Sequence, residues 1–156
     1  MFLKGSRNIF KEREQFIMAS ILDLSNKRHA HINERLQNDI TIWLCSVRPD
    51  GRPHAVIVWF LWDGESILIF SRPDNQKLRN IEHNANVLLA IDNTHNGNDP
   101  ITIEGKATLL PPGETSVTAA AYLAKYREHI KGIGFTPEQM AAAYSEAIRI
   151  IPTRVS

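Results

Sequence analysis

Short runs of β-branched and aromatic residues follow one another through the middle of this chain, and turn residues separate them. The runs "TIWLCSV" (residues 41–47) and "HAVIVWFLW" (residues 54–62) flank the turn sequence "RPDGRP". A second turn, at residues 63–65, leads into "SILIFS" (residues 66–71). β-Branched and aromatic residues favour strands, and Pro, Asp and Gly favour turns. The pattern predicts an antiparallel meander of three strands.

Further strands are expected in the second half of the chain. The segments "NVLLAID" (residues 86–92), "ITIEGKATLL" (residues 101–110) and "IRIIPTRV" (residues 148–155) have strand composition, and Gly105 indicates a bulge or bend. A chain of 156 residues suits one domain. Short antiparallel strands in this number close most economically into a small barrel, because closure removes the unpaired edges. The predicted fold is mainly β, with helices outside.

Helical patterns lie before, between and after these strands. The amphipathic spacing at residues 29–39 predicts a short helix, Asp74 is placed to cap a second one, and Thr136 begins a capping-box helix. A helix at residues 117–130 would bury Val117, Ala121 and Ala124. Residues 1–28 lack a clean period and are interpreted as an N-terminal arm or helix, which leaves residues 29–156 as the folded domain.

Composition narrows the classes of partner. The formal net charge is +1, so the chain has no global field that would attract nucleic acid or an acidic membrane. The longest apolar run, residues 55–62, is far shorter than the roughly 20 residues that cross a bilayer. Cys45 is the single cysteine, lies in an apolar run and is expected to be an inert core thiol. We therefore expect a soluble, cytoplasmic protein that binds neither nucleic acid nor membrane.

A dense group of polar side chains follows the strand at residues 66–71. Helical spacing places its later members on one face, opposite the apolar side chains, near a helix N-terminus that favours anions. This predicts a phosphate pocket, although a solvated helix face would have the same spacing. The group comprises Ser71, Arg72, Gln76, Lys77, Arg79 and Asn80.

Other kinds of site find no support in the sequence. His29 and His31 are two residues apart and would point away from each other on a helix, so they cannot hold one metal ion together. We find no zinc-binding pattern, no hydrolase-type arrangement and no candidate for general acid–base catalysis.

The run "RPDGRPHAVIVWFLWDGESILIFSRPDNQKLRNIEHNANVLLAID" (residues 48–92), followed by "ITIEGKATLL", resembles the pyridoxamine 5'-phosphate oxidase-like family of FMN-binding split β-barrels. The elements "VWFLWDG", K-x-R-N-I and the final "PTR" are most similar to the branch of deazaflavin (F420)-dependent reductases. This resemblance implies a split-barrel homodimer, with two cofactor sites at the interface between subunits.

The resemblance also implies which residues bind the cofactor. The second strand would lie against the flavin ring, largely through its backbone, and the helix start would hold the phosphate. The ring would be lined by Val56, Ile57, Val58, Trp59 and Phe60. The phosphate would be held by Phe70, Ser71, Gln76 and Lys77, supported by Arg79 and Asn80, with Arg72 as a further source of charge.

The chain also departs from the oxidases of this family. Gln76 and Lys77 stand where the oxidases have an Arg–Lys pair that binds the FMN phosphate, and Pro100 matches a glutamine that the oxidases supply from the strand before "EGKA". Pyridoxamine phosphate oxidation is therefore not expected, and coenzyme F420 fits these departures better than FMN. The leading hypothesis is an oxidoreductase that transfers a hydride between bound FMN or F420 and a small organic substrate. The alternative is a non-catalytic flavin- or haem-binding carrier of the same fold.

Overall fold

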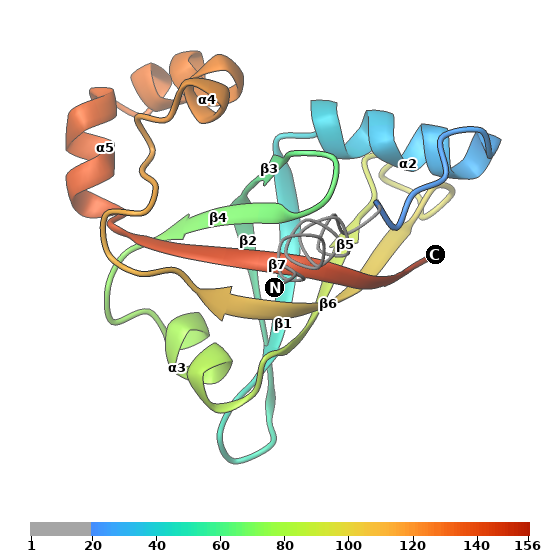
Figure 1. Ribbon diagram of the computed structural model, residues 1–156, viewed down its shortest axis with the longest axis horizontal. Helices are drawn as coiled ribbons and strands as arrows, with labels where there is room; N and C mark the ends of the chain where they lie inside the picture. The colour runs from blue at the N-terminus through green and yellow to red at the C-terminus, as the bar shows by residue number, and fades with distance from the viewer. Residues whose placement is uncertain (1–19) are drawn as a thin grey trace, which may run out of the picture.

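The computed structural model describes residues 20–156, and these form one curled antiparallel sheet with helices around it (Figure 1). The strands are β1 (Thr41–Val47), β2 (Pro53–Trp59), β3 (Leu61–Trp62), β4 (Ile67–Ser71), β5 (Asn86–Ile91), β6 (Ile101–Leu109) and β7 (Glu146–Val155). The helices are α2 (Lys27–Asn38), α3 (Gln76–His83), α4 (Ala120–Gly132) and α5 (Pro137–Ala143). The seven strands are ordered β2-β1-β5-β6-β7-β4-β3.

The two edge strands of this sheet, β2 and β3, are consecutive in the sequence and are separated only by Phe60. Because the chain runs directly from one edge to the other, the sheet has to curl until its edges meet. This arrangement confirms the predicted split β-barrel. It also shows that the prediction of one strand over residues 54–62 was wrong, since its first part pairs with β1 and its last part with β4.

The prediction of a three-strand meander was wrong for the same reason, because the chain changes partner at Phe60. β1 and β2 form the expected hairpin, with Thr41 opposite Trp59 and Val47 opposite Pro53. The strand that follows the second turn pairs with β3 and β7 instead of extending this hairpin. Residues 55–62 contain no Gly, Pro or charged residue that would mark the change of partner.

Alternating burial along the strands places the main core inside the curl. In β1, Ile42, Leu44 and Ser46 are buried while Thr41 and Trp43 are exposed, as the two-residue period of a strand requires. Cys45 lies on the outer side of β1 and is only partly buried, so the prediction that it belongs to the core was wrong.

Gly105 interrupts the register of β6 against β7, as predicted. A Cβ atom at this position would lie 2.7 Å from Cγ2 of Ile150 and 2.9 Å from the carbonyl oxygen of Ile151. No side chain fits at this distance, so glycine allows the two strands to approach each other.

The helices differ from prediction mainly in their ends and faces. α2 begins at Lys27, because the side chain of Asn26 accepts hydrogen bonds from two amides of its first turn. Asp74 does not cap α3; it takes a left-handed conformation with a φ of 67°, and Asn75 is the N-cap residue. The capping box of Thr136 on α5 is confirmed.

α4 buries a different face from the one predicted. Its buried side chains are Tyr122, Tyr126 and Ile130, whereas Ala121 and Ala124 are exposed. The tyrosines pack with Phe70 and other residues in a second apolar cluster under α4 and α5, next to the main core. These two helices lie together at one end of the molecule (Figure 1).

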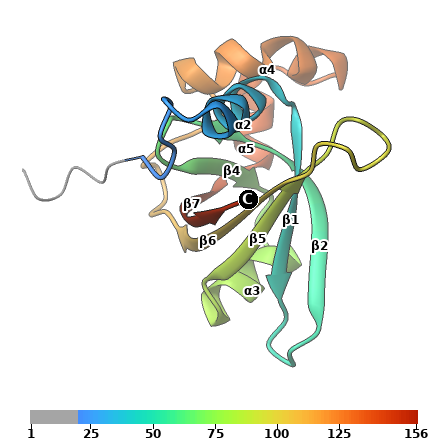
Figure 2. The same ribbon diagram turned by 90° about the vertical axis from the view of Figure 1, so that its right-hand side faces the viewer.

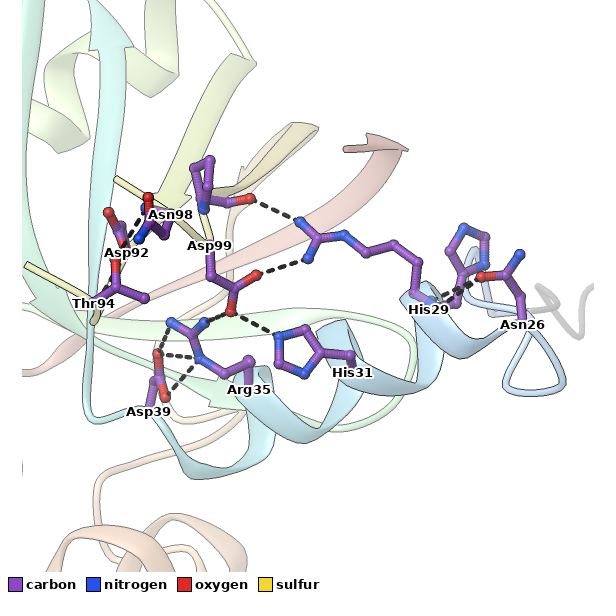
Figure 3. Close-up of polar contacts among 11 residues, drawn as sticks. Asn26, His29, His31, Arg35, Asp39, Asp92, Thr94, Asn98 and Asp99 are labelled. Atoms are coloured by element: carbon purple, nitrogen blue, oxygen red, sulfur yellow. Dashed lines mark hydrogen bonds and ion pairs between the residues drawn. The ribbon is translucent and has the colours of Figure 1, made fainter. Parts of the chain in front are cut away.

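The loop between β5 and β6 is fastened to α2 through Asp99. Figure 3 shows that the side chains of His31 and Arg35 converge on this carboxylate, and Arg28 donates to it at 2.8 Å. These hydrogen bonds from His31 and Arg28 lower the pKa of Asp99 to about 2.

Residues 1–19, most of the predicted N-terminal arm, lie outside the described part of the chain. Within residues 20–156, no helix combines the length and the apolar composition that a membrane span requires.

Candidate functional site

A cleft of about 430 Å³ lies between β2, the start of α3 and the two C-terminal helices. Its volume falls within the roughly 300–1,000 Å³ that is usual for small-molecule sites. The residues that line it are Val56, Ile57, Val58, Trp59, Phe70, Asn75, Lys77, Tyr122, Ile133, Met140 and Tyr144. Six of the residues predicted from the sequence are in this list, counting Val56, Ile57, Val58, Trp59, Phe70 and Lys77.

One wall of the cleft is the edge strand β2. Residues 56–59 all line the cleft although alternate side chains of a strand point to opposite faces. The cleft therefore follows the edge of the strand, where backbone groups as well as side chains are available to a ligand. Trp59 stacks on Tyr126 of α4, with ring centroids 4.9 Å apart and an interplanar angle of 9°. This stack fixes the end of the wall against the helix.

The opposite wall comes from α4, α5 and the residues that follow them. The ring of Tyr122 meets Phe70 of β4 edge to face, with centroids 4.9 Å apart and an interplanar angle of 88°. Ile133, Met140 and Tyr144 add further apolar surface. Sequence reasoning missed all of these residues and Asn75. The spacing of Tyr122 and Tyr126 by one helical turn was the available signal for an aromatic face on α4.

Lys77 is the only cation among the described residues that line the cleft, and 8% of its surface is exposed. Within residues 20–156 its side chain has neither a hydrogen bond nor an ion pair. Burial lowers the pKa of Lys77, because the charged form loses hydration that no internal partner replaces. A buried cation without a partner is costly unless an anion binds to it. The cleft thus combines a flat aromatic and aliphatic interior with one site for negative charge.

Four of the predicted polar residues make internal hydrogen bonds around α3. Asn80 is fully buried and donates to the hydroxyl of Ser46 at 2.9 Å. Gln76 donates to Asn80 at 2.8 Å and accepts from Arg79 at 2.7 Å. Ser71 is fully buried and donates to the carbonyl oxygen of Arg72 at 2.9 Å. These bonds hold the helix in place, and direct contact of these side chains with a cofactor stays a prediction.

Of the two remaining predicted residues, Arg72 lies beside the cleft and Phe60 lies in the main core. The guanidinium of Arg72 lies 4.8 Å from the centroid of the Tyr144 ring, beside a residue of the cleft lining. Phe60 is completely buried in the main core and does not line the cleft. A direct role of Phe60 against a flavin ring therefore has no support from the geometry, whereas Arg72 is placed near the rim.

An exposed apolar surface adjoins the cleft. Trp43 is 48% exposed, Ile57 is 54% exposed and Leu88 is 38% exposed. Trp43 pairs directly with Ile57 in the sheet, and Leu88 pairs with Cys45, so all of them lie on the outer face of β1, β2 and β5. Figure 2 shows β1 and β2 along one side of the molecule. Ile57 belongs to this outer face and to the cleft, so the two features are continuous.

The lining supplies little chemistry of its own. Among residues 20–156, the lining contains no carboxylate, thiol or imidazole, and its polar side-chain groups are the Lys77 ammonium, the Asn75 amide, the Trp59 indole N–H and the phenols of Tyr122 and Tyr144. The cleft therefore lacks the usual residues for general acid–base catalysis. Its apolar walls and the Lys77 ammonium suit a planar ring compound that carries negative charge.

Solved structures of other proteins are similar to this chain. A solved structure described as an F420 reductase is 27% identical, with a TM-score of 0.62, and the match covers 80% of this chain and 94% of the other. A conserved hypothetical protein from Mycobacterium tuberculosis is 22% identical, with a TM-score of 0.65 and 81% coverage of both chains. HutZ, the haem storage protein from Vibrio cholerae, is 16% identical, with a TM-score of 0.59 and coverage of 81% and 92%.

The likenesses at 22% and 16% identity concern the fold alone. No curated protein sequence matches the chain. The family model described as Pyridoxamine 5'-phosphate oxidase matches residues 29–156, which include every strand and nearly all of α2. The chain therefore belongs to the pyridoxamine 5'-phosphate oxidase family.

Proposed function

We propose that this protein is an oxidoreductase that transfers a hydride between a bound flavin or deazaflavin, FMN or F420, and a small organic substrate. The observation that carries the proposal is the position of Lys77, a buried cation without an internal partner in a cleft whose other walls are aromatic and aliphatic. The 27% identity to a structure described as an F420 reductase supports the deazaflavin form of the proposal.

The residues of the cleft divide between the two parts of such a cofactor. The edge of β2 at residues 56–59 would lie along the ring, and Tyr122 and Met140 would exclude water from the other side. Lys77 would bind the charged tail, with Arg72 near the rim. The bound cofactor supplies the redox chemistry, and the protein supplies placement and electrostatics. This division of labour explains why the lining needs no acid–base residue.

We also propose that the protein acts as a homodimer through the outer face of β1, β2 and β5. Trp43, Ile57 and Leu88 are large apolar side chains exposed together on this face. Contiguous apolar surface of this kind usually marks an interaction site. Since Ile57 lies on both this face and the cleft, a second copy would cover the open side of the cleft.

The rival function is a carrier that binds flavin or haem without turnover. Haem iron takes an axial ligand from His, Cys, Met or Tyr. Within the described part of the chain, the cleft lining offers Tyr122, Tyr144 and Met140 for this purpose and contains no His or Cys. Binding alone does not separate a carrier from an enzyme, because both need the same cleft.

The test is a titration of the purified protein with F420, FMN and haemin, followed by absorbance and by single-turnover kinetics. The proposal expects F420 or FMN to bind, and the bound reduced cofactor to be oxidised by small organic acceptors faster than the free reduced cofactor. Binding without acceleration, or binding of haemin alone, would support the carrier. If none of the three compounds binds, both functions are wrong.

A further inference from the structure

The hydroxyl group of Tyr122 is a buried hydrogen-bond donor without a partner in the described part of the chain. Tyr122 lies on α4 and borders the cleft, and only 1% of its surface is exposed. None of the hydrogen bonds within residues 20–156 involves its oxygen. This oxygen is not sealed in the core, because Nδ1 of His54 is the only fully enclosed side-chain nitrogen or oxygen without a partner in that range. The hydroxyl therefore opens on the cleft that Tyr122 lines.

The other two tyrosines of the chain differ from Tyr122 in this respect. The hydroxyl oxygen of Tyr126 lies 2.8 Å from the amide nitrogen of Phe60 and 2.6 Å from the carbonyl oxygen of Ile40, so the backbone already uses it. Tyr144 lines the cleft but is only half-buried. Buried polar groups are usually hydrogen-bonded, and a buried donor without a partner costs free energy. The free hydroxyl of Tyr122 therefore indicates a ligand with a hydrogen-bond acceptor.

Aromatic packing fixes the direction of this donor. The ring of Tyr122 meets Phe70 edge to face, and it packs on Tyr126 with centroids 4.7 Å apart and an interplanar angle of 31°. A buried ring held by two neighbours has one orientation, so the hydroxyl is in place before a ligand binds. A hydrogen bond from a donor held in this way costs little conformational entropy.

The acceptor that suits Tyr122 is a neutral oxygen. Burial raises the pKa of Tyr122, and the neighbouring phenols of Tyr126 and Tyr144 raise it further. The hydroxyl therefore keeps its proton at neutral pH, so that it donates a hydrogen bond but releases the proton poorly. An acceptor with a full negative charge would be attracted to Lys77 instead, because the walls around Tyr122 are aromatic and aliphatic.

We propose that the Tyr122 hydroxyl donates a hydrogen bond to the carbonyl oxygen of the substrate, and that the substrate is an α,β-unsaturated ketone or aldehyde with an apolar body. The reaction of this substrate rests on the proposed function, whereas the hydrogen bond does not. The sequence motifs did not indicate Tyr122, because its place in the cleft depends on the packing of α4 against β4.

The conjugated double bond follows from the chemistry that the lining allows. A hydride from the reduced flavin or deazaflavin brings two electrons and forms a C–H bond at the β-carbon of the substrate, which leaves the cofactor oxidised. The π electrons of the C=C bond shift towards the carbonyl group, whose oxygen becomes an enolate oxygen. The Tyr122 hydroxyl stabilises this developing charge, and a proton from water at the α-carbon completes the saturated product.

A simple ketone would place different demands on the cleft. Its reduction gives an alkoxide, which is more basic than an enolate and needs a proton donor at once. Among residues 20–156, the lining supplies neither a carboxylic acid nor an imidazole for this purpose. A single neutral donor therefore suits an enolate better than an alkoxide.

The first experiment measures binding without turnover. Benzylideneacetone is a flat enone, and trans-1-phenyl-1-butene has the same carbon skeleton without the carbonyl oxygen. Their dissociation constants are measured by equilibrium dialysis, for the protein alone and with oxidised FMN or F420, which has no hydride to transfer. We expect Tyr122→Phe to weaken the binding of benzylideneacetone by about 3- to 10-fold and to leave the binding of the hydrocarbon unchanged. Equal effects on the two compounds would overturn the inference.

The second experiment detects the hydrogen bond itself by infrared difference spectroscopy of benzylideneacetone labelled with ¹³C at the carbonyl carbon. A hydrogen bond to a carbonyl oxygen lowers its stretching frequency. We expect a lower frequency in the wild type than in Tyr122→Phe, which keeps the aromatic ring and its packing. The same frequency in both proteins would contradict the inference, as would a shift that disappears in Tyr144→Phe but persists in Tyr122→Phe.

Single-turnover oxidation of the bound reduced cofactor by benzylideneacetone separates this inference from the proposed function. We expect Tyr122→Phe to slow this step by about tenfold or more. If the infrared shift depends on Tyr122 but neither FMN nor F420 binds, the hydrogen bond stands and the proposed function is wrong. If benzylideneacetone is reduced equally fast by the wild type and by Tyr122→Phe, the function stands and this inference is wrong. If a cofactor binds but no enone is reduced, the assigned substrate class is wrong.

Discussion

The hydroxyl oxygen of Tyr126 lies 2.8 Å from the amide nitrogen of Phe60 and 2.8 Å from its carbonyl oxygen. Phe60 is the residue at which the chain leaves β2 and enters β3, so its amide belongs to neither strand. Tyr126 accepts from that amide and lies 2.6 Å from the carbonyl oxygen of Ile40. The Tyr126 hydroxyl on α4 therefore forms hydrogen bonds with the backbone of Phe60, at the point where the chain passes from β2 to β3.

Replacing Tyr126 with Phe should destabilise the protein by about 1–3 kcal/mol, because it leaves the buried amide of Phe60 without an acceptor. Urea-induced unfolding measures the change. Tyr144→Phe is the matched control, since Tyr144 has no hydrogen bond through its hydroxyl within residues 20–156. A Tyr126→Phe variant as stable as Tyr144→Phe would show that the hydroxyl does not support the crossover.

Lys77→Met should weaken the binding of FMN by about 10- to 100-fold, because it removes a charge-assisted contact with the phosphate. The affinity for riboflavin should change much less, since this compound has no phosphate. Isothermal titration of both compounds measures the two effects. Lys131→Met, at an exposed position on α4, is the control and should leave both affinities unchanged. Equal losses for FMN and riboflavin would place the phosphate away from Lys77.

Most strands could be predicted from the sequence because runs of β-branched and aromatic residues between turn residues mark them. The sequence did not reveal the point at which the chain passes from one edge of the sheet to the other. Residues 54–62 read as one strand, since an apolar run carries no mark at Phe60. The break depends on Tyr126 and on the ammonium of Lys125, which lies 3.0 Å from the carbonyl oxygen of Phe60. Both groups are more than 60 residues away in the sequence. No local pattern contains that information.

For the candidate site, too, the sequence predicted the features that depend on neighbouring residues and missed those that depend on long-range packing. The second strand and Lys77 are local features, and both line the cleft. The wall from α4 and α5 was missed because Tyr122 and Met140 reach the cleft only through the packing of the helices against β4. The polar cluster after β4 was recognised as a group, but hydrogen bonds inside it, such as that between Gln76 and Asn80, became visible only in three dimensions.

Asp99→Asn should destabilise the protein by about 1 kcal/mol after allowance for solvent screening, because Arg28 and Arg35 lose their shared carboxylate. The pKa of Asp99 is lowered from 3.8 to about 2, so its contribution is complete above about pH 4 and is lost as the pH falls towards 2. The difference in unfolding free energy between wild type and variant should shrink over that interval.

The control for this titration is Asp50→Asn, which removes an exposed ion pair with Arg52 in the β1–β2 turn. The side chains of this pair are 71% and 55% exposed, so the substitution should have no measurable effect. A difference for Asp99→Asn that stays constant down to about pH 2 would mean that its charge does not stabilise the loop.

Trp43→Glu should convert the proposed dimer to a monomer, because it places a charge in the centre of the exposed apolar face. Sedimentation equilibrium measures the molecular mass. Leu24→Glu adds the same charge at another exposed apolar residue and should leave the dimer intact. If wild type and Trp43→Glu have the same mass, this face is not the subunit interface.

Lys125→Met should remove a pH-dependent contribution to stability. Burial lowers the pKa of Lys125 from 10.5 to about 8, while its ammonium lies 3.9 Å from the centroid of the Phe60 ring. Between these pKa values the unfolded chain binds more protons at this residue than the folded chain, so the stability of the wild type rises with pH. Relative to Lys125→Met, the free energy of unfolding of the wild type should increase by about 2 kcal/mol between about pH 8 and pH 10.5, after allowance for screening of a partly buried group.

Chemical denaturation over this range measures the increase. Lys125→Arg keeps its charge throughout and should show no such gain, whereas a gain equal to that of the wild type would assign the effect to another residue.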